Sequence, residues 1–149
     1  MAQLIFDKEA TSDQLTLIAE LLVQEFTKKK PFHLHLIGEL GAGKTTLMRY
    51  MLQRIGLAKN QPVNSPTFSY MYEYEIKHEH YAHLDLYRID QAKSVDVLDL
   101  LSAREYRGVF TEWPQMANSQ SDIEPTHILK ISYPDGDDIS KRSYKLYSA

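Results

Sequence analysis

The residues most suited to chemistry lie between positions 38 and 45, which spell GELGAGKT. This segment matches G-x-x-x-x-G-K-[ST], a pattern whose glycines let backbone N–H groups converge on phosphates. Lys44 would reach the β- and γ-phosphates of a nucleotide, and the hydroxyl of Thr45 would bind magnesium. The phosphate-binding loop would comprise Glu39, Leu40, Gly41, Ala42, Gly43, Lys44, Thr45 and Thr46. The pattern predicts binding of a nucleotide with Mg2+, whereas hydrolysis depends on further residues.

Two carboxylates stand where strands are expected to reach this loop. Glu112 ends the apolar stretch GVFTE, and Asp85 lies in HLDLYR. A P-loop enzyme needs an acid that holds magnesium and a group that orients the attacking water, so the candidate catalytic residues are Lys44, Asp85 and Glu112. The alternatives are that Glu112 caps a neighbouring loop and that Asp85 forms a surface ion pair with Arg88. Spacing alone does not decide their roles.

Three histidines and a proline-containing loop give weaker signals. His78, His80 and His83 invite a zinc hypothesis, but they straddle a hairpin tip and a strand, whereas zinc needs three or four convergent ligands. His83 is better placed as a neighbour of Asp85 that fixes this carboxylate or titrates near neutral pH. In VNSPTF, at 63–68, the proline biases the preceding residue away from helix. This loop is either an ordinary strand entry or a segment that senses the γ-phosphate.

The phosphate-binding loop requires a strand before it and a helix after it, and the sequence predicts both. HLHLIG, at 33–38, alternates like a strand, and a helix is expected over 44–55 before a glycine. An earlier strand at 3–6 precedes a helix that Thr11 or Ser12 would cap. Its apolar positions recur at helical spacing: Leu15, Ile18, Ala19, Leu22 and Phe26.

The remaining expected elements would place Asp85 and Glu112 near the phosphate-binding loop. Tyrosine-rich stretches at 67–75 and 80–87 predict a hairpin. Because strand side chains alternate, one face of its second strand would hold Tyr81, His83, Asp85 and Tyr87. An acidic helix capped by Ser94 is expected over 94–104, and further strands are expected at 108–112, 127–133 and 143–147. These elements predict an α/β fold with a mixed parallel and antiparallel sheet.

The composition bounds the function classes. A chain of 149 residues with 43% hydrophobic content is expected to form one domain over 1–149. The lack of cysteine excludes disulfides, thiolate zinc sites and thiol catalysis. No apolar run approaches the roughly 20 residues of a membrane-spanning helix and no signal peptide is evident, so a cytoplasmic protein is expected. The net charge of −3 gives no overall attraction to nucleic acid, although local contacts could involve the lysines at 28–30, Lys141, Arg142 and Lys145.

Four motifs taken together resemble the ordered motif set of the TsaE family. They are GELGAGKTT at 38–46, VNSPTFSY at 63–70, HLDLYR at 83–88 and TEWP at 111–114. The resemblance implies a P-loop ATPase with a three-layer P-loop NTPase-like fold that uses ATP and Mg2+. It also implies work with the TsaD and TsaB proteins, which install a threonylcarbamoyl group on the adenosine next to the anticodon of certain tRNAs. The ATP cycle would activate or reset that pair, and tRNA would be met indirectly through the complex.

The resemblance also implies roles for individual positions. Lys44 and Thr45 match the phosphate and magnesium positions, and Glu112 matches the acidic residue at magnesium. Asp85 matches the carboxylate of HxDxYR, for which we expect the positioning of water, although the two acids could exchange roles. Trp113 matches the aromatic residue beside the nucleotide. The switch-like loop of the family matches Ser65, Pro66, Thr67 and Phe68.

Other functions could use the same phosphate cradle. A small-molecule kinase would need an acceptor pocket and usually arginines on a closing lid, and no lid-like insertion is visible in the sequence. A non-enzymatic nucleotide-sensing adaptor would bind ATP and a partner without turnover. A GTPase is disfavoured because the chain has no N-K-x-D stretch to read guanine.

Overall fold

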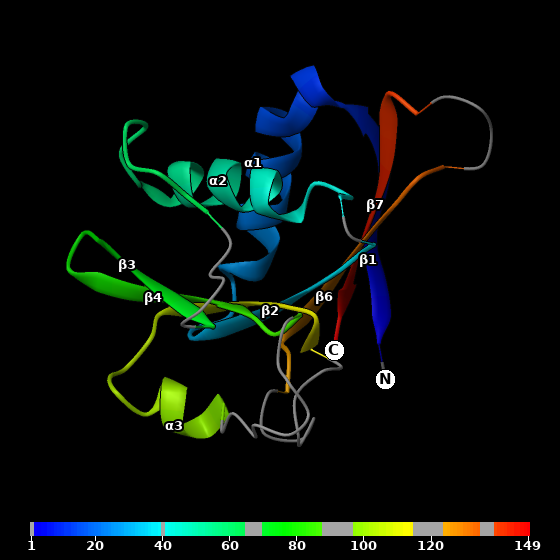
Figure 1. Ribbon diagram of the computed structural model, residues 1–149. Coiled ribbons are helices and arrows are strands. Elements are labelled where there is room, and N and C mark those ends of the chain that lie inside the picture. Colours follow the sequence, from blue (N-terminus) through cyan, green and yellow to red (C-terminus); the bar gives the residue numbers. More distant parts are fainter. Residues whose placement is uncertain (1, 40, 65–69, 88–96, 115–123, 135–138) are drawn as a thin grey trace.

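The protein is built around one mixed β-sheet. The computed structural model describes residues 2–39, 41–64, 70–87, 97–114, 124–134 and 139–149. Within these ranges the sheet has seven strands in the order β1-β7-β6-β2-β5-β4-β3 (Figure 1). The strands are β1 (Gln3–Thr11), β2 (Phe32–Ile37), β3 (Met71–Ile76), β4 (Glu79–Asp85), β5 (Gly108–Glu112), β6 (His127–Ser132) and β7 (Lys141–Ser148). The expected α/β fold with a mixed sheet is confirmed.

Parallel pairing in the middle of the sheet brings three strand ends together. β5 pairs in parallel with both β2 and β4, and β6 runs parallel to β2. β7, β1 and β3 each join a neighbour in antiparallel fashion at the two sides. Because parallel strands share one direction, the carboxyl ends of β2, β4 and β5 lie at the same edge. In open α/β sheets this is the edge at which ligands bind.

Helices cover both faces of the sheet. α1 (Leu15–Phe26) and α2 (Lys44–Ile55) lie on one face, and the short α3 (Val97–Leu101) lies on the other (Figure 1). The expected apolar positions of α1 are all buried: Leu15, Ile18, Ala19, Leu22 and Phe26. The three expected layers are therefore present. Within the described ranges, no helix combines the length and apolar character that crossing a membrane requires.

Strand alternation divides the buried side chains between two apolar clusters. Phe26, Phe32 and Phe110 belong to the larger cluster beneath α1 and α2. Leu84 and Val109 belong to a smaller cluster that contacts partly buried leucines of α3. The ring centroids of Phe26 and Phe32 are 4.6 Å apart, and those of Phe32 and Phe110 are 5.4 Å apart. These contacts join α1 to the start of β2 and to the middle of β5.

Several element boundaries differ from the sequence expectation. β1 continues to Thr11 instead of ending at residue 6, because it pairs along its length with β7. β4 ends at Asp85, two residues early, because the Asp85 carboxylate accepts the N–H of Tyr87 and turns the chain. The helix expected over 94–104 ends three residues early, because α3 stops at Leu101, and its expected cap, Ser94, lies outside the described residues. By contrast, α2 begins and ends as expected.

Candidate active site

The phosphate-binding loop lies between the end of β2 and the start of α2, as expected. Gly41 and Gly43 have φ angles of 82° and 98°, in the left-handed region. A Cβ atom on either residue would meet nothing within 4 Å, so glycine is needed there for the backbone conformation and not for space. Gly43 is the N-cap of α2, whose first N–H groups and positive dipole end therefore point into the loop.

Lys44 is folded back onto the loop that precedes it. Its ammonium group donates to the carbonyl oxygens of Gly38 at 2.5 Å and Glu39 at 3.1 Å. Burial lowers the pKa of Lys44, and the carboxylates of Glu112 and Asp85 oppose this shift. The ammonium group therefore lies inside the loop, where two backbone carbonyl oxygens hold it. It can exchange carbonyl oxygens for phosphate oxygens when an anion enters.

Asp85 and Glu112 approach the loop from neighbouring strands. They are paired in the parallel register of β4 and β5, and Glu112 is only 2% exposed. Burial raises the pKa of Asp85, against the hydrogen bond from the Tyr87 N–H, and the nearby Glu112 raises it further. The positive charge of Lys44 partly opposes this rise. Since neighbouring carboxylates disfavour each other's charge, a cation between them would relieve the repulsion.

These groups line one cavity of about 290 Å³. The lining residues are Gly41, Gly43, Lys44, Thr45, Thr46, Asp85, Tyr87, Glu112 and Trp113. Magnesium prefers hydroxyl, carboxylate, phosphate and water oxygens, and the cavity offers the Thr45 hydroxyl and two carboxylates. The donor set therefore fits Mg2+ beside a phosphate chain. The three candidate catalytic residues, Lys44, Asp85 and Glu112, are brought together as expected.

Trp113 borders this cavity. It directly follows Glu112 and has a φ of 57°, which is rare for an aromatic residue and typical of strained functional positions. Its ring centroid lies 4.7 Å from that of Tyr87 and 4.4 Å from the Nζ of Lys44. Trp113 is also the only tryptophan in the chain. Its fluorescence should therefore report events at Lys44.

The histidine of HLDLYR contacts Glu112 and not Asp85. His83 is fully buried, and its Nε2 lies 2.5 Å from the Oε2 of Glu112. The expectation that His83 fixes Asp85 is therefore wrong about the hydrogen-bond partner. In the β4–β5 register His83 stands opposite Phe110, two residues before Glu112 on the same face. Its ring reaches diagonally across to the neighbouring strand, which sequence spacing could not show.

A second cavity, of about 350 Å³, adjoins the loop. Its lining residues are Ala10, Ser12, Leu15, Ala42, Gly43, Thr46, Ile139, Ser140, Arg142 and Tyr144. Gly43 and Thr46 line both cavities, so a molecule with phosphates in the first could extend into the second. No sequence pattern predicted this cavity, and Arg142 was expected only as a basic residue for local contacts with nucleic acid. Its walls come from β1, the start of α1 and β7, and these residues form no local motif.

Part of the expected site lies outside the described residues. This concerns Leu40, the alternative ion-pair partner Arg88, and the switch-like loop of Ser65, Pro66, Thr67 and Phe68. Their roles stay predictions.

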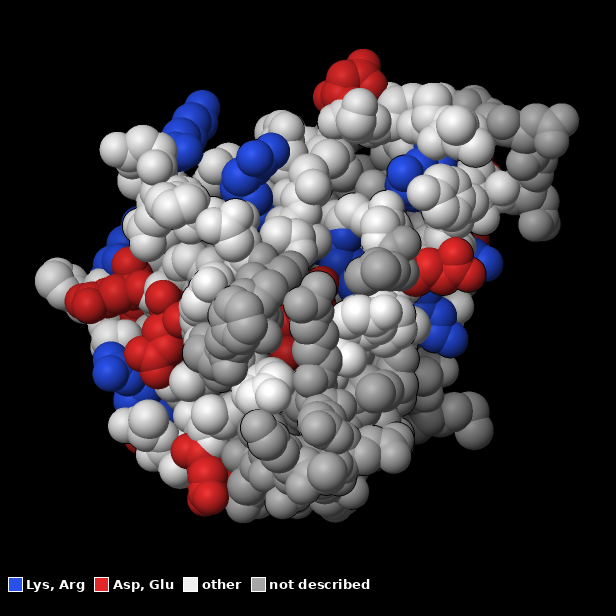
Figure 2. All heavy atoms as spheres, in the orientation of Figure 1, with Lys and Arg blue, Asp and Glu red and all other residues white. Residues whose placement is uncertain are grey.

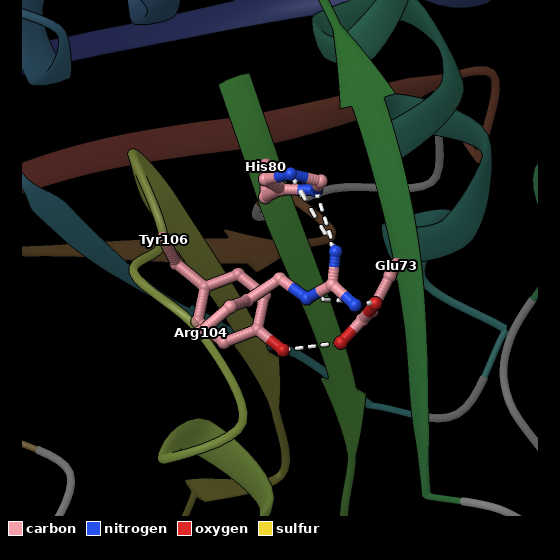
Figure 3. A network of polar contacts seen from close by, with 4 residues as sticks. All are labelled: Glu73, His80, Arg104 and Tyr106. Atoms are coloured by element: carbon pink, nitrogen blue, oxygen red, sulfur yellow. Dashed lines mark hydrogen bonds and ion pairs between the residues drawn. The ribbon is translucent and has the colours of Figure 1, made fainter. Parts of the chain in front are cut away.

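His80 belongs to a separate polar network, away from His83. The Nη1 of Arg104 lies 3.1 Å from the Nδ1 of His80, and its Nε lies 3.5 Å from a carboxylate oxygen of Glu73. The hydroxyl of Tyr106 donates to the same carboxylate (Figure 3). His80 and His83 are three residues apart on β4, so their side chains leave opposite faces of the strand. The two histidines therefore do not converge, and the guanidinium beside His80 opposes a bound cation.

Charges of both signs are interspersed among the described residues on the face shown in Figure 2. Two of the basic residues proposed for local contacts already have partners within the chain. Lys28 pairs with Glu25 at 3.0 Å, and the guanidinium of Arg142 lies 4.0 Å from the ring centroid of Tyr133. The Lys28 side chain is 67% exposed, and direct contact of these positions with RNA stays a prediction.

The matching family model and two curated relatives carry the same TsaE description. The family model for "Threonylcarbamoyl adenosine biosynthesis protein TsaE" matches residues 8–144. The chain is 42% identical over 88 residues to the tRNA threonylcarbamoyladenosine biosynthesis protein TsaE of Haemophilus influenzae, covering 59% of this chain and 52% of that protein. It is 38% identical over 84 residues to the protein of the same name from a Nostoc species, covering 56% and 47%. The match thus spans about half the length of these curated relatives.

A solved structure supports the fold. The crystal structure of YdiB from Bacillus subtilis superposes with a TM-score of 0.70, covering 99% of this chain and 87% of that chain at 23% identity. This likeness concerns the fold alone. The family model, in contrast, matches most of the chain's length. The chain therefore belongs to the TsaE family, a family of P-loop nucleotide-binding proteins.

Proposed function

We propose that this protein binds ATP with Mg2+ where β2, β4 and β5 end, hydrolyses it slowly, and supports tRNA threonylcarbamoyladenosine (t6A) modification together with the TsaD and TsaB proteins. The observation that carries the proposal is the one cavity shared by Lys44, Thr45, Asp85 and Glu112. The names of the curated relatives support the pathway. We expect the protein to act in the cytoplasm, with its ATP cycle activating or resetting the TsaD–TsaB pair and with tRNA met through that complex.

The position of each side chain supports a distinct role. Lys44 would leave its backbone carbonyl acceptors and donate charge-assisted hydrogen bonds to the β- and γ-phosphates. Thr45 and Glu112 would hold the magnesium ion, which when bound neutralises charge that develops on the phosphates. Asp85, whose Oδ1 is held by the Tyr87 N–H, would orient the attacking water through its other oxygen. The two acids could exchange these roles.

The second cavity suits the adenosine of the nucleotide. Its walls combine apolar side chains, among them Ala10 and Leu15, with the hydroxyl groups of Ser12 and Tyr144. Pockets of this mixed character bind flat, partly polar ligands such as nucleobases. The two cavities meet at Gly43 and Thr46, where the phosphate chain would begin. The phosphates would then lie over the first turn of α2, and Trp113 would border their far end.

ATP turnover by the purified protein, alone and with the TsaD–TsaB pair, tests the proposal. We expect weak turnover alone, a rise with the pair, and loss of turnover in the Lys44→Ala and Glu112→Ala variants. A Glu105→Ala variant, which removes an exposed acid away from the loop, serves as the matched control.

Other outcomes would favour the competing functions. Phosphate transfer to a small metabolite would indicate a kinase. Tight ATP binding without turnover, even with the pair present, would indicate a nucleotide-sensing adaptor. Absence of any response to the pair, with nucleotide binding intact, would contradict the proposed role in t6A formation.

A further inference from the structure

His83 is a polar side chain in the interior of the sheet. Its exposed fraction is 0%, and its neighbours Ala82 and Leu84 are also 0% exposed. Burial of a hydrogen-bonding group disfavours folding unless the group finds a partner. An apolar side chain could fill this position without that penalty. The imidazole therefore needs a role that packing alone does not provide.

The imidazole has one hydrogen-bond partner within the described part of the chain. Its Nε2 lies 2.5 Å from the Oε2 of Glu112, whereas its Nδ1 is buried and meets no partner among the described residues. A proton on Nδ1 would be a buried donor without an acceptor, which folded proteins avoid more strictly than an unused acceptor. The hydrogen-bond pattern therefore assigns the proton to Nε2, which donates it to Glu112.

This hydrogen bond occupies one oxygen of a carboxylate that borders the phosphate cavity. The Glu112 side chain is 3% exposed and lines the cavity together with Lys44 and Thr45. With Oε2 held by His83, Oε1 is the oxygen left for a ligand. A hydrogen bond to the second oxygen of a metal-binding carboxylate fixes its orientation and raises metal affinity.

We infer that His83 is the positioning residue of Glu112: its Nε2–H holds Oε2 so that Oε1 is presented to the magnesium ion of a bound nucleotide. The inference rests on the proposed function and adds a residue that touches neither the phosphates nor the ion. His83 acts through Glu112 only. Its removal should therefore weaken the contribution of magnesium to nucleotide binding and leave magnesium-free binding intact.

The test measures the affinity for a non-hydrolysable ATP analogue by Trp113 fluorescence, once with EDTA and once with excess Mg2+. The ratio of the two dissociation constants is the magnesium-dependent gain. We expect His83→Leu to reduce this gain by about 10–100-fold, the range found for lost partners of metal ligands. Affinity in EDTA should not change. His83→Gln, whose amide can donate from a similar position, should keep most of the gain.

Two further variants separate positioning from general damage. His33→Leu removes another histidine hydrogen-bonded to β5, because the Nε2 of His33 lies 2.7 Å from the Oγ1 of Thr111. His33 projects from the opposite face of the sheet, so this control should retain the gain. His83→Asn keeps a polar side chain that is too short to reach Oε2. It should lose the gain as His83→Leu does, and it provides the test if the leucine variant fails to fold.

Several results would overturn the inference. These are an unchanged gain in both His83→Leu and His83→Asn, or an equal loss in His83→Asn and His83→Gln. In a Glu112→Gln background, His83→Asn should cause no further loss, and an additive loss would also refute action through Glu112. If the unaltered protein binds no nucleotide at all, the proposed function fails and the inference with it. Magnesium-dependent binding that is indifferent to His83 would refute the inference alone.

Discussion

Replacement of Asp85 by asparagine should stabilise the ligand-free protein while it impairs the site. Asp85 stands beside Glu112 in the β4–β5 register, and burial together with Glu112 raises its pKa above 3.8. The folded chain then binds this proton more tightly than the unfolded chain does. The free energy of unfolding therefore falls as the pH rises through the range between the pKa of Asp85 in the unfolded chain and its pKa in the folded chain. At neutral pH this loss of stability is complete. Asparagine removes the charge and keeps an oxygen for the Tyr87 N–H.

The magnitude follows from the geometry of the pair. Side-chain pairs directly opposite on neighbouring strands contribute about 0.2–1 kcal/mol, and like charges there are destabilising. Burial adds to this repulsion and attraction from Lys44 offsets part of it, and the pKa of Asp85 is raised overall. We expect the unfolding free energy at neutral pH to rise by about 0.5–1 kcal/mol. In a chain of this size that corresponds to an increase in Tm of about 1–4 °C.

Urea unfolding followed by circular dichroism, without nucleotide, measures this effect. The control is Asp7→Asn, which removes the same unit of charge at an exposed position of β1 and should stay within about 0.5 kcal/mol of the parent. The gain from Asp85→Asn should shrink as the pH is lowered towards about 4, where the carboxyl group of the parent is increasingly protonated. A variant less stable than the parent at neutral pH, or a gain that persists unchanged in acid, would contradict an unfavourable charge on Asp85 as the source of the gain.

Three other changes have defined expected outcomes. Lys44→Met should reduce nucleotide affinity by about 10–100-fold, measured by nucleotide titration, and unchanged affinity would contradict the role of Lys44. The same change should alter Trp113 emission in the ligand-free protein. Gly108→Ala places a Cβ 2.1 Å from the Cζ of the buried Phe32 and should destabilise the fold by about 1–3 kcal/mol in urea unfolding, whereas a neutral result would mean that the ring can move aside. Burial lowers the pKa of His33 to about 3, so this group makes the unfolding free energy fall as the pH drops from 6.5 towards 3. His33→Leu should reduce this fall of the unfolding free energy in acid. An unchanged dependence of stability on pH would contradict the contribution of His33.

The phosphate-binding loop could be predicted from the sequence because its parts are contiguous. The strand, the glycine-rich turn and the helix follow one another along the chain. Gly41 and Gly43, which the segment supplies, allow the left-handed conformations that the turn adopts. Asp85 and Glu112 could also be placed, since both end strands and parallel strands deliver their ends to the same edge. Local patterns therefore located the acids but left their roles open.

The remaining parts of the site depend on pairing between distant segments. The partner of His83 is set by the register of β4 against β5, so spacing within HLDLYR pointed to the wrong carboxylate. The second cavity joins β1 to β7, and the pairing of these strands over residues at opposite ends of the chain has no sequence signature. For the same reason the length of β1 was underestimated, because its partner extends it. Tertiary pairing decided each of these features.

A crystal structure with a non-hydrolysable ATP analogue and Mn2+ would test the proposed nucleotide site most directly, because anomalous scattering locates the manganese ion. Manganese replaces magnesium at oxygen ligands and marks the metal position unambiguously. We expect phosphates over Gly41–Thr45 and the metal in direct coordination by Thr45 and Glu112, at about 2.1 Å for an ion of this kind. Phosphates outside this cavity, or a metal held away from both residues, would contradict the proposed nucleotide site.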